Sequence, residues 1–126
     1  MAHIALIDDD PVEAMVIGGL LEHVDPAHRL ERFASVQAFV ERETADFDLV
    51  LLDRRVPPHQ TFASSLEALA SSAYGGPVVM LTASAETEIA LSWRGGLHGP
   101  VDKGRLLTPD AVARLINRVL GTDPAG

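Results

Sequence analysis

The sequence predicts an α/β domain in which a five-stranded parallel sheet, with strand order 2-1-3-4-5, carries helices on both faces. Three observations predict this fold. Short, continuous apolar runs at residues 4–7, 49–52 and 78–81 are typical of strands that are buried on both faces of a parallel sheet. Helical patterns separate these runs, and strict alternation of strand and helix favours parallel pairing. The length of 126 residues fits one such domain.

The first half of the chain contains two strand–helix units. The strand at residues 4–7 is followed by a helix over residues 11–23, which Asp10 caps and which has proline at its first position. A weaker strand follows at residues 28–34. Ser35 is then placed to cap a short second helix.

The second half continues the same alternation. The strand at residues 49–52 leads to a predicted helix over residues 62–72, and the strand at 78–81 leads to one over residues 86–94. A fifth strand, at about residues 97–101, is only weakly indicated, because its glycine and proline are poor strand formers.

The last helix has the clearest boundaries. Thr108 is its predicted N-cap, Pro109 is its first residue, and Gly121 ends it. Residues 122–126 are predicted to be a short C-terminal tail. We therefore expect one domain over residues 1–121, with no room for a second domain.

Composition excludes several classes of function. The chain has 10 Lys and Arg against 18 Asp and Glu, and this net charge of −8 argues against binding to nucleic-acid phosphates or anionic lipid. It has no Cys, which excludes thiol catalysis, disulfides and Cys-ligated zinc. No apolar run approaches the roughly 20 residues of a membrane span. The first apolar run stops at three aspartates, unlike a signal peptide. We expect a cytoplasmic protein without membrane insertion and without direct nucleic-acid binding.

Polar residues that could carry chemistry follow four of the predicted strands. They are Asp8, Asp9 and Asp10 after the first strand, Asp53 after the third, Thr82 after the fourth and Lys103 after the fifth. In an open α/β sheet, ligands bind at the carboxyl ends of the strands, where the strand order reverses. Because the first and third strands are neighbours in the predicted order, the two acidic clusters are expected to meet in one pocket.

Such a meeting of carboxylates points to a cation. Two carboxylates about 5 Å apart repel by roughly 3 kcal/mol at an effective dielectric constant of 20. Mg²⁺ suits hard oxygen ligands that leave room for water, and a nearby lysine and hydroxyl suit a phosphoryl group. The pattern predicts a carboxylate nucleophile that takes up phosphate with the help of Mg²⁺.

Each residue also has a simpler interpretation. Asp10 before a proline is most simply a helix cap, Thr82 alone is a strand-end hydroxyl, and Lys103 alone is a solvated surface charge. The functional interpretation depends on all of these positions falling at strand ends in the right order.

Four stretches of the chain resemble the receiver domains of two-component response regulators. They are IALIDDDP, DLVLLDRRVPP, PVVMLTAS and VDKG, and the spacings between Asp9, Asp53, Thr82 and Lys103 are 44, 29 and 21 residues. The resemblance covers essentially the whole chain. It implies a flavodoxin-like fold and a CheY-like, single-domain regulator.

The resemblance implies a role for each site residue. Asp53 is the expected phosphoacceptor. Mg²⁺ is the expected cofactor, with Asp9 as a direct ligand, Asp8 acting beside it or through water, and Arg55 offering its backbone carbonyl. The remaining roles fall to the Thr82 hydroxyl and the Lys103 ammonium, both of which are expected to contact the phosphoryl group.

The resemblance also implies the partners. The phosphoryl donor is expected to be a sensor histidine kinase or a histidine phosphotransfer protein, and the signal is expected to pass to a downstream protein through binding. Beyond accepting phosphate and slowly losing it again, no enzymatic activity is expected.

Several positions depart from the family pattern and leave alternatives open. Pro100 stands where the family has a rotating aromatic side chain, Gly104 follows the lysine in place of proline, and Thr61 replaces a glycine. These departures leave open a degenerate receiver that acts as a phosphorylation-independent interaction module or a phosphate sink. An Asp-nucleophile phosphatase is disfavoured, because it needs a second Asp where Arg55 stands. Trp93 either packs on the core or docks a partner.

Overall fold

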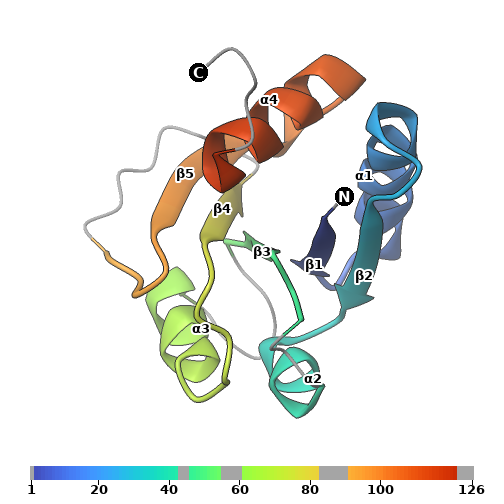
Figure 1. The fold of residues 1–126 in the computed structure, drawn as a ribbon. Coiled ribbons are helices and arrows are strands. Elements are labelled where there is room, and N and C mark those ends of the chain that lie inside the picture. Colours follow the sequence, from blue (N-terminus) through green and yellow to red (C-terminus); the bar gives the residue numbers. More distant parts are fainter. Residues whose placement is uncertain (1, 43–45, 55–60, 83–90, 122–126) are drawn as a thin grey trace.

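The computed structural model describes residues 2–42, 46–54, 61–82 and 91–121. Five strands form one parallel sheet in the order β2-β1-β3-β4-β5, which confirms the predicted fold class and strand order (Figure 1). The elements are β1 (His3–Ile7), α1 (Pro11–Val24), β2 (Arg29–Phe33), α2 (Val36–Glu41), β3 (Leu49–Asp53), α3 (Phe62–Leu69), β4 (Val78–Thr82), β5 (Leu97–Asp102), a 3-10 turn (Lys103–Arg105) and α4 (Pro109–Leu120).

The helices cover the sheet in two layers. Helices α1 and α4 lie together on one face, and α2 and α3 lie on the other (Figure 1). No helix of the described residues has both the length and the apolar character that crossing a membrane requires.

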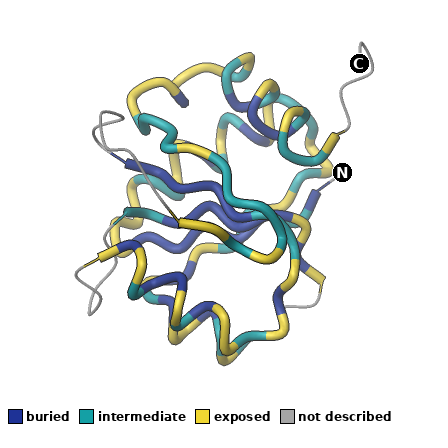
Figure 2. Tube along the Cα trace, turned by 90° about the vertical axis from the view of Figure 1, so that its left-hand side faces the viewer, coloured by how far each residue is buried: buried dark blue, intermediate teal, exposed yellow. Residues whose placement is uncertain are grey.

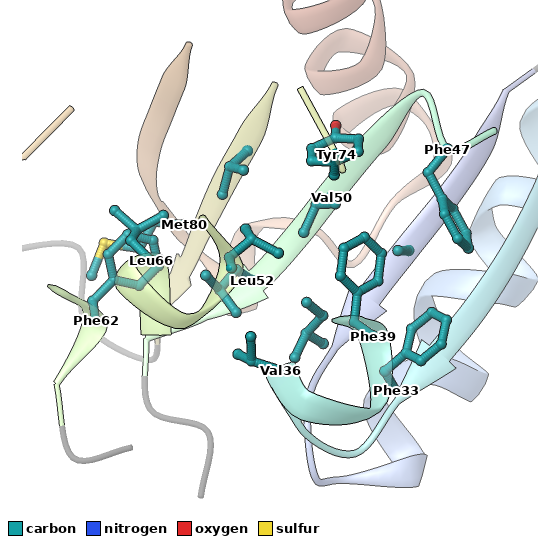
Figure 3. Close-up of a cluster of buried hydrophobic side chains, with 14 residues drawn as sticks. Phe33, Val36, Phe39, Phe47, Val50, Leu52, Phe62, Leu66, Tyr74 and Met80 are labelled. Carbon is teal, nitrogen blue, oxygen red and sulfur yellow. The ribbon is translucent and has the colours of Figure 1, made fainter. Parts of the chain in front are cut away.

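Side chains of the central strands alternate between two cores, as the continuous apolar runs predict. In β1, Ala5 and Ile7 face α2 and α3, whereas Ile4 and Leu6 face α1 and α4. The buried residues accordingly run along the strands through the middle of the molecule, between helices with exposed outer faces (Figure 2). The core under α2 and α3 is rich in aromatic rings, and its members include Phe33, Phe39, Phe47, Phe62 and Tyr74 (Figure 3).

Helix starts follow the capping residues read from the sequence. The side chain of Asp10 accepts a hydrogen bond from the Val12 N–H, and Thr108 caps α4 in the same manner. Ser35 caps α2. Thr61, which is unusual against the family pattern, has a simple structural role here as the N-cap of α3.

Helix α3 is shorter than the predicted range of 62–72. It ends at Leu69, and the chain continues as a turn. The hydroxyls of Ser71 and Ser72 donate to the carbonyls of Ala68 and Leu69, each over 2.7 Å. The backbone N–H groups of the two serines also bond to these carbonyls, three residues back rather than four, so the chain leaves the α-helical hydrogen-bond pattern at this point.

The predicted helix over residues 86–94 is wrong where it can be compared. Residues 91–93 have no regular structure and Arg94 lies in a turn, while 86–90 fall outside the described residues. The indole N–H of Trp93 donates to the Gly76 carbonyl over 2.8 Å. The Arg94 guanidinium donates to the carbonyls of Ala70, Ser72 and Tyr74. These long-range contacts hold the segment against the α3–β4 connection and override its helical pattern.

The weakly indicated fifth strand is confirmed, as β5. Gly99 adopts φ +107°, and a Cβ there would crowd the backbone of Met80. The pairing of β4 with β5 shifts register between Val79 and Leu81, and the Gly99–Pro100 peptide bond is cis. Glycine is therefore used at the point where the strand departs from regular pairing.

Candidate functional site

Strand register brings the predicted site residues to one edge of the sheet. Asp8 follows β1 directly, Asp53 ends β3, Thr82 ends β4, and Lys103 follows β5 directly. Ile7 is paired with Leu52 in the register, so Asp8 and Asp53 occupy adjacent positions on neighbouring strands.

Three carboxylates meet at this edge. Asp8, Asp9 and Asp53 each offer an oxygen atom, and these atoms all lie within 4.8 Å of one another. Asp8 is buried, Asp53 is partly buried and Asp9 is exposed. Hard oxygen ligands with one side open to water fit Mg²⁺. The donor set therefore fits the cation that the sequence predicts.

Lys103 bridges two of the three carboxylates. Its Nζ atom lies 3.0 Å from Asp8 Oδ2 and 3.1 Å from Asp53 Oδ1. Burial by itself would lower the pKa of the Lys103 ammonium, but its hydrogen bonds to Asp8 and Asp53 outweigh burial and raise that pKa above its ordinary value. Lys103 is thus a cation held between two site carboxylates, rather than a solvated surface charge.

The ionised form of the Asp53 carboxyl is disfavoured by its surroundings. Burial raises its pKa above the ordinary value, Lys103 opposes this rise, and the Asp8 charge adds to it. The cost of burying the Asp53 charge therefore exceeds what Lys103 compensates.

Backbone contacts hold the acidic loop in place. Asp8 Oδ1 accepts from the Asp10 N–H over 2.9 Å, and the Asp8 N–H donates to the Phe33 carbonyl over 3.0 Å. Arg32 of β2 donates to the Asp8 carbonyl over 3.1 Å. Asp10 caps α1 and is not one of the three grouped carboxylates, which confirms its simpler interpretation.

Comparison with known proteins gives a fold. No protein-family model matches the chain, and no curated protein matches it. Among solved structures, the N-terminal domain of a response regulator/sensory box/GGDEF three-domain protein from Carboxydothermus hydrogenoformans is 23% identical with a TM-score of 0.69. That match covers 98% of this chain and 97% of the other. The chain has the receiver-domain fold.

Two further receiver-fold structures carry ligands. The receiver domain of a sensor histidine kinase from Pseudomonas aeruginosa, solved with a magnesium ion coordinated in its active site cleft, is 24% identical. The match covers 95% of this chain and 98% of that one, with a TM-score of 0.66. A Thermotoga maritima response regulator in complex with Mg²⁺ and BeF is 17% identical over 95% of this chain and 100% of that one, with a TM-score of 0.68.

The remaining predicted residues are placed in part. Thr82 is buried at the end of β4, opposite Asp102 in the register of β5. Gly104 lies in the 3-10 turn after β5, where its N–H donates to Asp102 Oδ1 over 2.8 Å. Arg55, the expected carbonyl ligand, lies outside the described residues, so its role stays a prediction.

Trp93 is part of the receiver fold's core packing. Its ring is partly buried against the aromatic-rich core, and the Arg94 guanidinium lies 4.6 Å from the ring centroid. The indole N–H is bonded to the Gly76 carbonyl, and the apolar part of the ring packs on the core. The structure favours packing over partner docking at this position.

Two residues at the site escaped the sequence analysis. Glu13 lies 3.8 Å from Lys103 Nζ through its Oε1 atom, and Arg32 supports the acidic loop. Glu13 stands three residues after the N-cap Asp10, in the first turn of α1, and this position at the start of the helix is a signal that could have placed it near the site. Arg32 could not have been found in this way, because its contact depends on the pairing of β1 with β2.

Proposed function

We propose that this chain is a receiver that accepts a phosphoryl group on Asp53 from the phosphohistidine of a histidine kinase or phosphotransfer protein. The observation that carries the proposal is the position of Lys103 Nζ, 3.0 Å from Asp8 and 3.1 Å from Asp53, beside the three grouped carboxylates. A structural ion pair needs one acid, whereas this lysine stands at a site with acids in excess.

The transfer uses few groups. An Asp53 carboxylate oxygen attacks the phosphorus atom, the phosphorus–nitrogen bond of the donor breaks, and the electron pair leaves with the imidazole. Lys103 is positioned to pair with the phosphoryl oxygens, and Thr82 stands at the end of the neighbouring strand. Magnesium bound by Asp8, Asp9 and Asp53, with the Arg55 carbonyl as a further expected ligand, would neutralise charge on the transferring oxygens.

The ligands of the similar structures support this assignment. A magnesium ion in one receiver cleft, and Mg²⁺ with BeF in another, show that the shared fold accommodates a divalent cation and a beryllium fluoride group. The proposed activity is limited to accepting phosphate and losing it slowly to water, and the signal is proposed to pass to a partner protein. No turnover of a separate substrate is proposed at this site.

The test is phosphorylation by a small-molecule donor. We expect acetyl phosphate with Mg²⁺ to add one phosphoryl group to the wild type, measured by intact mass, and to add none to Asp53→Asn. Asp10→Asn is the matched control, because it removes one negative charge as Asp53→Asn does, lies in the neighbouring acidic loop and keeps a good N-cap. It should still be labelled.

Two outcomes would contradict the proposal. Labelling that persists in Asp53→Asn would reject Asp53 as the acceptor. An unlabelled wild type that keeps its fold would favour the phosphorylation-independent interaction module instead.

A further inference from the structure

Glu13 is placed to act on Lys103 without belonging to the carboxylate group. It lies in the first turn of α1, its side chain is 29% exposed, and its Oε1 atom is 3.8 Å from Lys103 Nζ. The oxygens that lie within 4.8 Å of one another come from Asp8, Asp9 and Asp53. Within the described residues, Glu13 therefore contacts the site through Lys103.

The local hydrogen bonding explains why Glu13 faces the lysine. Asp10 and Glu13 have the spacing of a capping box, in which the glutamate usually accepts from the N–H of the capping residue. Here the Asp10 N–H donates to Asp8 Oδ1 over 2.9 Å instead. Glu13 is released from its ordinary partner and is paired with Lys103.

We propose that Glu13 is a positioning residue that competes with the phosphoryl group for Lys103 and so weakens the phosphorylated state. The inference rests on the proposed function. Lys103 faces three carboxylates, from Asp8, Asp53 and Glu13. A phosphoryl group on Asp53 adds acceptor oxygens and negative charge beside them. Pairing of Lys103 with Glu13 then opposes its pairing with the new anion.

Beryllofluoride, a phosphoryl mimic, gives a direct readout. In a titration with saturating Mg²⁺ followed by ¹⁹F NMR, we expect Glu13→Gln to bind beryllofluoride about two- to fivefold more tightly than the wild type, the range for a partly exposed ion pair. Glu22→Gln, an exposed change of the same charge farther along α1, should bind like the wild type.

Two further variants separate contact from charge. Glu13→Asp keeps the charge but is one methylene shorter, so it loses the contact and should tighten binding as Glu13→Gln does. In a Lys103→Gln background, Glu13→Gln should have no further effect, because the contested ammonium is gone.

The outcomes separate this inference from the function beneath it. A wild type that binds no beryllofluoride overturns the proposed function, and the inference fails with it. If the wild type binds beryllofluoride and Glu13→Gln binds it with the same affinity, the inference is overturned and the proposed function stands. Wild-type affinity in Glu13→Asp, or a persistent gain in the Lys103→Gln background, would show a general charge effect and would also overturn it.

Discussion

At the carboxyl ends of the strands, carboxylates outnumber the ammonium group that bridges them, whereas at the opposite ends acidic and basic side chains pair with one another. Arg42 there contacts both Glu31 oxygens, over 3.0 and 3.2 Å. The His3 ring lies 3.6 Å from Glu31 on one side and 3.6 Å from Asp46 on the other. The Asp48 carboxylate accepts a hydrogen bond from the backbone N–H of His3 over 2.8 Å.

The difference lies in arrangement rather than in residue type. The opposite end lines an open cavity and also contains several carboxylates, but Arg29 and Arg42 stand among them. Its Arg42–Glu31 pair is more than a third exposed on each side. At the site, Asp8 is 1% exposed and Lys103 19%. Buried carboxylates with too few cations around them attract a ligand cation. Exposed ion pairs are screened by water and interact only weakly with further charges.

The largest expected difference concerns the two central cations. Lys103→Met leaves the buried Asp8 and the partly buried Asp53 without their ammonium partner, so we expect the free energy of unfolding to fall by about 2–4 kcal/mol. Arg42→Met removes an exposed pair and should cost less than about 1 kcal/mol. Urea denaturation of both variants in EDTA makes the comparison. Equal losses would show that the two ends are built alike.

A second difference concerns magnesium. We expect Mg²⁺ at about five times its dissociation constant to raise the free energy of unfolding by about 1 kcal/mol through mass action, which is about 4 °C in Tm for a domain of this size. Asp9→Ala should remove this shift, and Asp46→Ala at the opposite end should retain it. A Tm of the wild type that does not respond to Mg²⁺ would remove the distinction.

The central strands could be predicted because each is a short, continuous run of apolar residues. A continuous apolar run indicates a strand that is buried on both faces, so the run from Ile4 to Ile7 predicted both a strand and its place inside a parallel sheet. Asp8, Asp53 and Lys103 could then be grouped, because parallel strands end at one edge. Their convergence therefore followed from topology and from residue type.

Other features could not be predicted, because they depend on contacts between distant segments. The helical pattern before Gly95 fails because Trp93 and Arg94 bond to the connection between α3 and β4. Glu13 matched a capping box in sequence, but its role changed once Asp8 took the Asp10 N–H. In the first case hydrogen bonds between distant segments replaced the helix, and in the second a contact with Lys103, ninety residues along the chain, replaced the local cap.

The smallest expected effect is a dependence of the free energy of unfolding on pH. Burial raises the pKa of Asp53 in the folded protein, so the folded state holds this proton more tightly than the unfolded chain does. As pH rises, the unfolded chain loses the proton first, near its ordinary pKa of about 4. The stability contributed by the protonated form is present below that pH and is lost as pH rises through the folded pKa.

Asp53→Asn removes this loss, since an amide carries no charge and Lys103 retains Asp8 as a partner. We therefore expect the variant to match the wild type at about pH 3 and to be modestly more stable at pH 7 in EDTA, measured by urea denaturation. Asp48→Asn at the opposite end should show no gain at pH 7, because the Asp48 carboxylate accepts the His3 N–H. If Asp53→Asn is instead the less stable protein at pH 7, the attraction of Lys103 for Asp53 exceeds the cost of its burial, and the carboxylates at the site are compensated as fully as those at the opposite end.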